Sequence, residues 1–336
     1  MRTAQFRHPS DALFEATPVL PLIPACEHFA GNARMILKAL ALQADFAGRF
    51  DLTCDCEDGA SLGQESAHVH QVAQLLAQHS NTPGRRGVRI HDVSHPHWRT
   101  DVEVLMGEAG SSIDYVTLPK AGSVAEVDRM ICFIERRSAA ASVAMPRIHV
   151  LIETLDALND APMIAALPGV ETLDFGIMDF VSAHHGALSF EAMHSPLQFT
   201  HPLLMRAKAD LVAAALACGV VPAHNVSQAL NDPQEVERDA RLAREQFGFL
   251  RMWSIHPSQI EPILRAMSPT DAAVRHAGEI LLAAQARDWG PINHDGVLHD
   301  RASYRHCWTV LQRARAAGLP IPQTVSAAFF LDSAEA

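Results

Sequence analysis

The sequence has few cysteines, no long apolar run and no basic stretch, and each of these absences excludes a class of protein. Its six cysteines lie among 336 residues without the paired spacing of a zinc site or a disulfide framework, which favours free thiols in a reduced protein. No segment reaches the roughly 20 apolar residues that span a bilayer, and the N-terminal residues contain no apolar run of signal-peptide length. We therefore expect a cytoplasmic protein with no membrane partner.

The charged residues argue against nucleic acid as a partner. The 27 lysines and arginines are outnumbered by 38 aspartates and glutamates, the net charge is −11, and the basic residues are scattered along the chain. Such a surface is poorly suited to neutralising a phosphate backbone. Apolar residues make up 48% and charged residues 19%, which is ordinary for a folded protein with a sizeable core.

Strand-like and helix-like segments alternate from about residue 17 to residue 267, the pattern of a parallel sheet with crossover helices. We predict eight strands, at 19–24, 51–56, 87–91, 115–119, 148–153, 172–178, 220–225 and 250–255. An open doubly wound sheet is the competing fold, but no Gly-x-Gly-x-x-Gly turn follows the first predicted strand. The sequence thus favours an α/β fold, a (β/α)₈ TIM barrel, over residues 1–267.

After Met267 the pattern changes to two helical segments, 270–288 and 302–317. Residues 289–300 join them and are rich in turn-forming and polar residues, which predicts an ordered surface loop. We expect residues 268–336 to form a C-terminal helical extension at a subunit interface.

Polar side chains stand at the ends of the predicted strands, where a (β/α)₈ barrel carries its functional groups. In chain order these residues are Asp55, Glu57, Asp58, Arg89, His91, Lys120, Glu153 and Asp179. Strand side chains alternate between two faces, so Asp55 and Glu57 share one face of their strand, and Arg89 and His91 share one face of theirs.

Glu153 and Asp179 each end an apolar segment, and burying a charge is costly unless something compensates it. Mg²⁺ takes oxygen ligands, and an open catalytic site often gives it one or two carboxylates and leaves the other positions to water and substrate. The alternative is that each carboxylate caps the helix that follows its strand. Spacing alone leaves both interpretations open.

Six short segments of the chain occur in an order that is more specific than any one of them. They are Asp55-Cys-Glu-Asp-Gly59, Val88-Arg-Ile90, Leu118-Pro-Lys120, Leu151-Ile-Glu-Thr154, Phe175-Gly-Ile-Met-Asp179 and Ile255-His-Pro-Ser-Gln-Ile260. These segments resemble the ordered motifs of the citrate lyase beta subunit and malyl-CoA lyase family, also called the HpcH/HpaI aldolase family. The resemblance covers roughly residues 19–317.

The resemblance implies a (β/α)₈ barrel whose members make or cleave a carbon–carbon bond with Mg²⁺, or Mn²⁺ in its place, holding an oxo or hydroxy acid. By this resemblance, Glu153 and Asp179 match the metal ligands. Arg89 matches the arginine that grips the substrate carboxylate, a task suited to a planar fork of donors.

The resemblance also implies three acidic catalytic residues. Glu57 and Asp58 match the acidic pair beside the metal's water shell, and Asp300 matches an aspartate that the family offers to the neighbouring subunit as acid or base. Lys120 and His91 are predicted to contact the substrate. A Schiff base on Lys120 is disfavoured, because a lysine beside carboxylates stays charged in an ion pair.

A zinc site is an alternative for the segment that contains His91, His95 and His97, since imidazole is a common zinc ligand. The segment lacks a clear fourth ligand, so we expect His95 and His97 to be solvated.

The predicted function is a Mg²⁺-dependent carbon–carbon lyase that acts through a metal-stabilised enolate on a β-hydroxyacyl-CoA or a related hydroxy dicarboxylic acid ester. The alternatives are a class II-type aldolase for a free 4-hydroxy-2-oxo acid and a beta subunit active only within a citrate lyase complex. Departures from the family pattern at Met178, 249–253 and 224–225 leave the carrier open between coenzyme A, an acyl carrier protein and none. The expected partners are a small organic acid or its CoA thioester, and further copies of the chain in a trimer or hexamer.

Overall fold

The computed structural model describes residues 7–14, 20–60 and 63–330, which form two compact units. The larger unit is Pro24–Met267, and the smaller one combines described residues from 1–23 and 268–336. Residues 7–14 and 20–23, expected in the barrel domain, belong to the smaller unit. None of the helices among the described residues has the length and apolarity that a membrane span requires.

Eight parallel strands close into a barrel in the larger unit, in the order β1 to β8, with β8 pairing with β1. The strands are β1 (Cys26–Ala30), β2 (Asp51–Asp55), β3 (Arg86–Arg89), β4 (Tyr115–Leu118), β5 (Arg147–Ile152), β6 (Val170–Phe175), β7 (Val221–His224) and β8 (Arg251–Ser254). The helices are α2 (Ala33–Asp45), α3 (Glu65–Gln78), α4 (Trp98–Ala109), η1 (Gly110–Ser112), α5 (Val124–Ala141), α6 (Leu155–Ala165), α7 (Ile177–Ser182), η2 (Phe190–Met193), α8 (Leu197–Thr200), α9 (Pro202–Ala217), α10 (Pro233–Leu242), η3 (Ala243–Phe247) and α11 (Pro257–Met267). The predicted (β/α)₈ TIM barrel is thus confirmed.

Helix α5 illustrates why these residues form the outer layer. Ser123 is its N-cap and accepts a hydrogen bond from the backbone N–H of Glu126, which satisfies one of the free donors of the first turn. The buried residues Val127, Ile131 and Ile134 recur at three- and four-residue steps and face the barrel. One stripe of the helix therefore packs against the strands.

The first strand lies later in the chain than the sequence predicts. Residue 19 is outside the described residues, and 20–24 is not a strand, because prolines at 21 and 24 have no N–H to donate to a sheet. The strand is instead β1, whose Glu27 and His28 are buried. The prediction is wrong here because the apolar run at 19–24 suggests a strand, whereas β1 carries Glu27 and His28 into the barrel.

An ionic network lies inside the barrel at the end where the strands begin, and it explains that buried charge. Arg251 donates to Asp51 Oδ2 and to Glu27 Oε2, each over 2.7 Å, and all three side chains are fully buried. His149 lies 3.0 Å from Glu171 Oε2 and stacks on Tyr115 with ring centroids 4.0 Å apart. Glu27, Asp51 and Arg251 come from three strands that only a closed barrel brings together, so the network ties β1, β2 and β8.

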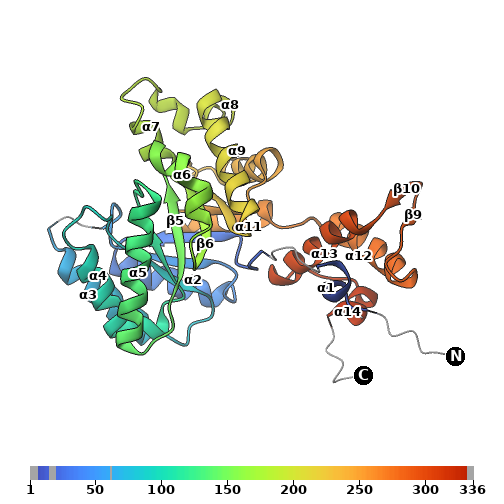
Figure 1. Cartoon of the computed structure of the whole chain (residues 1–336), viewed down its shortest axis with the longest axis horizontal. Helices are drawn as coiled ribbons and strands as arrows, with labels where there is room; N and C mark the ends of the chain where they lie inside the picture. The colour runs from blue at the N-terminus through green and yellow to red at the C-terminus, as the bar shows by residue number, and fades with distance from the viewer. Residues whose placement is uncertain (1–6, 15–19, 61–62, 331–336) are drawn as a thin grey trace. The chain divides into compact units, whose positions relative to one another are not determined.

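The smaller unit is mostly helical and has its own apolar core. It contains α1 (Pro9–Leu13), α12 (Asp271–Ala286), β9 (Ile292–His294), β10 (Val297–His299), α13 (Arg301–Ala316) and α14 (Gln323–Phe329). The two helical segments predicted after Met267 match α12 and α13. The segment 289–300 is not only a loop, because β9 and β10 pair as an antiparallel hairpin around the turn at Asp295 and Gly296 (Figure 1).

Candidate active site

The predicted polar residues of the barrel gather at the carboxyl ends of its strands. Glu57 and Asp58 follow β2, Arg89 ends β3, and Lys120 follows β4. Glu153 follows β5 directly. Asp179 lies in the first turn of α7 rather than at a strand end, because β6 stops at Phe175.

Glu153 is a buried carboxyl beside a second carboxylate. Its side chain accepts the backbone N–H of Lys120 at 2.7 Å, and the residue is only 3% exposed. Burial first, and then the charge of Asp179, raise the pKa of Glu153 to about 8. A buried carboxyl that also feels the charge of a second carboxylate favours the uptake of either a proton or a cation.

The backbone around Glu153 is shaped to fit that side chain. A Cβ on Gly176 would lie 2.3 Å from Glu153 Oε2 and 2.5 Å from its Cβ, so only glycine leaves room at this position. Lys120 has φ +47°, an uncommon value for a residue with a side chain, and its N–H points at the Glu153 carboxyl. The surrounding chain thus holds Glu153 in one orientation.

Arg89 is clamped by two acidic residues and an aromatic ring. Its Nε and Nη2 donate to the two oxygens of Asp55 at 2.7 and 2.5 Å, and its Nη1 lies 3.0 Å from Glu57 Oε2. The guanidinium also sits over the ring of Phe29, 5.5 Å from its centroid. A guanidinium has five N–H donors, so at least two remain for a ligand.

Asp55 and Phe29 are site residues whose roles the sequence did not indicate. Burial opposes the charge on Asp55, but Arg89 and the N–H groups of Glu57 and Gly59 outweigh it and lower the pKa of Asp55. Asp55 therefore stays ionised and orients Arg89. The position of Asp55 on the same strand face as Glu57 could have indicated its role. Phe29 could not be placed, because it lies on β1, outside the predicted first strand.

Lys120 is charged, and its ammonium group is held in ion pairs with two carboxylates. Its ammonium group donates to Glu57 Oε1 and to both oxygens of Asp58, at 3.0 and 2.9 Å for the latter. Burial opposes the charge on Lys120, but these hydrogen bonds outweigh it and raise its pKa above its ordinary value. A lysine held in this way is a poor Schiff-base nucleophile.

His91 is buried at the end of β3 and held by α4. Its backbone N–H and its Nδ1 both lie in hydrogen bonds with Asp101 Oδ2, at 3.1 and 2.6 Å. Its ring stacks on that of His95 at 4.0 Å between centroids, and His97 lies 6.3 Å away. Two groups of three metal-ligating residues occur in the part of the chain that the structure describes, and neither includes these histidines. The zinc alternative therefore gains no support.

Asp300 belongs to the smaller unit, where it is exposed and forms the N-cap of α13. Its Oδ1 accepts the backbone N–H of Ala302 at 2.9 Å, and its own N–H donates to Ser303 Oγ at 3.0 Å. One side-chain oxygen therefore supports the helix start.

An apolar cluster of the barrel contacts Arg89 through Phe29. It consists of Phe29, Leu151, Ala223, Val226 and Trp253. The rings of Phe29 and Trp253 lie 4.9 Å apart, and the buried Nε1 of Trp253 has no hydrogen-bond partner. Apolar surroundings of this kind strengthen the electrostatic interactions of the polar groups beside them.

Helix capping, the alternative explanation for the carboxylates, does not account for Glu153, whereas Asp179 lies in the first turn of α7, where a carboxylate also stabilises the helix dipole. The N-cap of α6 is Thr154, which accepts the N–H of Ala157, and the N-cap of α7 is Gly176. The two carboxylates interact, and the pKa of the buried one, Glu153, is raised. This donor set fits a hard divalent cation that keeps positions for water and substrate.

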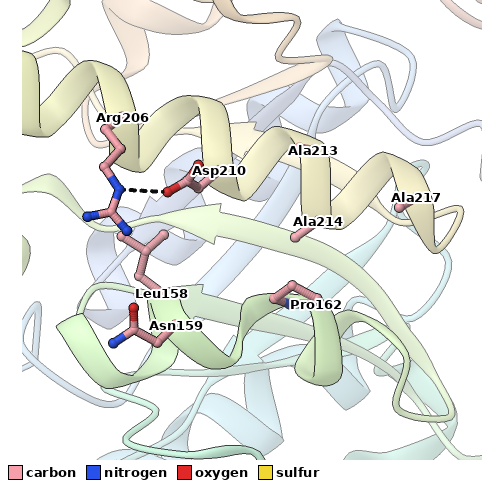
Figure 2. Close-up of a pocket in the computed structure, with 8 residues that line it drawn as sticks. All are labelled: Leu158, Asn159, Pro162, Arg206, Asp210, Ala213, Ala214 and Ala217. Atoms are coloured by element: carbon pink, nitrogen blue, oxygen red, sulfur yellow. Dashed lines mark hydrogen bonds and ion pairs between the residues drawn. The ribbon is translucent and has the colours of Figure 1, made fainter.

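The cavity in Figure 2 lies elsewhere, on the outer side of the barrel between α6 and α9. It is lined by Leu158, Asn159, Pro162, Arg206, Asp210, Ala213, Ala214 and Ala217. Its charged groups pair with each other, since Arg206 Nε donates to Asp210 Oδ2 at 3.0 Å. The cavity contains none of the strand-end residues, so the barrel mouth is the better candidate site.

Comparison with known proteins gives concordant matches along the chain. A profile of the HpcH/HpaI aldolase/citrate lyase family matches residues 30–257. The L-malyl-CoA/beta-methylmalyl-CoA lyase of Cereibacter sphaeroides is 28% identical over 319 residues, which cover 90% of this chain and 98% of the relative. A crystal structure of a citrate lyase from Burkholderia xenovorans LB400 is 48% identical, with a TM-score of 0.86 and coverage of 96% of this chain and 100% of that one. The Mycobacterium tuberculosis protein CitE, in complex with magnesium, acetoacetate and coenzyme A, is 25% identical, with a TM-score of 0.66 and coverage of 88% and 98%.

Proposed function

The chain belongs to the HpcH/HpaI aldolase/citrate lyase family and is a carbon–carbon lyase, and from this premise we propose that it acts with Mg²⁺ on a β-hydroxyacyl-CoA ester or a related hydroxy dicarboxylic acid ester. The observation that carries the proposal is the Glu153–Asp179 carboxylate pair beside Arg89. The names of the relatives support it, since one is a malyl-CoA lyase and another was crystallised with magnesium and coenzyme A.

In this proposal Arg89 binds the carboxylate of the oxo-acid half of the substrate. Asp55 occupies the Nε side of its guanidinium, so the remaining N–H groups are presented in a fixed direction. A fixed donor fork lowers the entropy lost on substrate binding.

Glu153 and Asp179 are the residues that would hold Mg²⁺. The bound ion would stabilise the negative charge that develops on the oxygens of the oxo-acid half during cleavage or condensation. The Lys120 N–H keeps Glu153 turned toward this position, and the buried surroundings of Glu153 keep water from competing.

Cleavage or condensation also requires a general acid or base that moves the hydroxyl or α-carbon proton of the substrate. This group should not already be neutralised by an ion pair. Glu57 lies between Arg89 and Lys120, and Asp58 pairs with Lys120, so the charges of both carboxylates are already compensated by ion pairs. Asp300 has no ion pair with a lysine or arginine among the described contacts, which favours it as the acid or base. As the family resemblance implies, it would act in the site of a neighbouring subunit within a homo-oligomer.

The test is Mg²⁺-dependent release of glyoxylate, pyruvate or oxaloacetate from malyl-CoA, citramalyl-CoA and citryl-CoA by the purified chain. Glu153→Ala and Asp179→Ala should abolish turnover, whereas Asp156→Ala, an exposed carboxylate on α6, should leave it unchanged.

The outcome separates the proposal from its competitors. Turnover of one ester that both site variants lose supports a CoA-ester lyase and identifies the substrate. Turnover only of a free 4-hydroxy-2-oxo acid, or only after other subunits are added, would contradict it.

A further inference from the structure

The smaller unit carries a cluster of imidazole and carboxylate groups that the proposed lyase site does not use. His276 and Glu279 lie one turn apart on α12, and His294 lies on β9. One ligand atom from each of the three falls within 4.8 Å of the others. His294 Nε2 is 3.8 Å from Glu279 Oε2, too far for a hydrogen bond. The three side chains therefore converge on one point without satisfying one another.

His299 brings a third imidazole to the same place. In the hairpin, Val297 pairs with His294 and His299 pairs with Ile292, so His294, His299 and the buried Ile292 share the face that packs on α12. The ring centroids of His276 lie 5.9 Å from those of His294 and 6.2 Å from those of His299. The rings of His294 and His299 are 6.4 Å apart. Three imidazoles thus stand at the corners of a nearly equilateral triangle.

The buried nitrogens of this cluster lack partners. His294 Nε2 and both ring nitrogens of His299 are buried and make no hydrogen bond, and His299 is only 9% exposed. Buried polar atoms are almost always paired, because leaving them unpaired costs free energy. A cation at the centre of the triangle would supply the missing partner.

We propose that His276, Glu279, His294 and His299 bind a Zn²⁺-class cation that ties the β9–β10 hairpin to α12. Imidazole with one carboxylate is a donor set that suits zinc and not magnesium. Ligand nitrogens in tetrahedral zinc sites lie about 3.3 Å apart for metal–nitrogen distances of about 2.0 Å, so His276, Glu279 and His294, whose ligand atoms fall within 4.8 Å of one another, need side-chain adjustments of roughly 1 Å. His299 lies outside that group and would have to turn further toward the ion to become the fourth ligand. The exposed Asp295, whose Oδ2 is 3.7 Å from His294 Nε2, adds negative charge that favours the cation.

The second group of metal-ligating residues does not compete for this role. Glu27, His149 and Asp174 lie inside the barrel, where Arg251 already donates to Glu27. Another cation there would face the buried guanidinium. The site in the smaller unit is independent of the Glu153–Asp179 pair and of the proposed function.

The test is a zinc titration of the full chain in excess Mg²⁺, with a chromogenic chelator as competitor. The variants are His276→Ala and Glu279→Gln, both exposed positions whose replacement leaves the core intact. His306→Ala, an exposed histidine on α13, is the matched control, and Asp179→Asn reports on zinc bound in the barrel.

We expect one zinc per chain, with affinity reduced on the order of 10–100-fold or more in His276→Ala and Glu279→Gln and unchanged in His306→Ala and Asp179→Asn. Zinc should also raise the thermal midpoint of the native chain and not that of His276→Ala. Equal zinc binding by all variants, or its loss in Asp179→Asn alone, would overturn the proposal.

Discussion

The raised pKa of Glu153 predicts that Mg²⁺ binding releases a proton. With a pKa of about 8, this carboxyl is about nine-tenths protonated at pH 7 and about one-tenth protonated at pH 9. A metal ligand must be deprotonated, so binding should release about 0.9 proton at pH 7 and about 0.1 at pH 9. The apparent Mg²⁺ affinity should rise about tenfold per pH unit below pH 8.

Titration calorimetry in two buffers with different ionisation enthalpies measures this proton count. Asp156→Asn, which removes an exposed carboxylate of α6, should release the same number of protons as the native chain. A release near zero at pH 7, or one that does not change between pH 7 and pH 9, would refute the assignment of Glu153 as a ligand with a raised pKa.

The same shift makes the metal-free protein less stable as pH rises. The pKa of Glu153 is about 8 in the folded chain, above its ordinary value of 4.5, so between these pH values the folded chain holds a proton that the unfolded chain has lost. The contribution of Glu153 to the free energy of unfolding is therefore complete below pH 4.5 and is lost as pH rises to 8, at about 1.4 kcal/mol per pH unit. Mg²⁺ should offset this loss, and Glu153→Gln should remove the pH dependence that this group contributes.

Three further substitutions test the packing around the site and the barrel interior. Gly176→Ala should weaken Mg²⁺ binding in calorimetry by at least tenfold, because its Cβ would displace the Glu153 carboxyl; unchanged binding would contradict the close fit. Arg89→Lys should raise KM on the order of tenfold or more in steady-state assays, since an ammonium lacks the planar fork that holds both oxygens of Asp55 and still offers N–H donors to a substrate carboxylate, and an unchanged KM would argue against carboxylate binding there. Arg251→Met should lower the free energy of unfolding by about 3–5 kcal/mol in urea titrations, because it leaves buried carboxylates uncompensated, and a neutral effect would show that the network is dispensable.

Alternating strand and helix patterns were sufficient to predict the barrel, because parallel strands that are covered by helices are apolar on both faces. The pattern failed at β1, where Glu27 and His28 are buried by contacts with residues from other strands. Those partners, such as Arg251, are distant in sequence.

The sequence predicts residues for the candidate site but not their geometry. Motif order identified Arg89, Glu153 and Asp179, yet it did not indicate that Asp55 clamps Arg89 or that Asp179 lies on a helix. The left-handed backbone at Lys120 was also hidden, since a lysine rarely adopts it. Such features depend on how adjacent loops meet, which the pattern of one loop does not contain.

Anomalous diffraction from crystals grown with Mn²⁺ in place of Mg²⁺ would test the central claim most directly. We predict a manganese peak within bonding distance of both the Glu153 and Asp179 carboxylates, with no peak there in Asp179→Asn crystals. A peak at other residues, or none at this pair under conditions in which the enzyme turns over with Mn²⁺, would contradict the account.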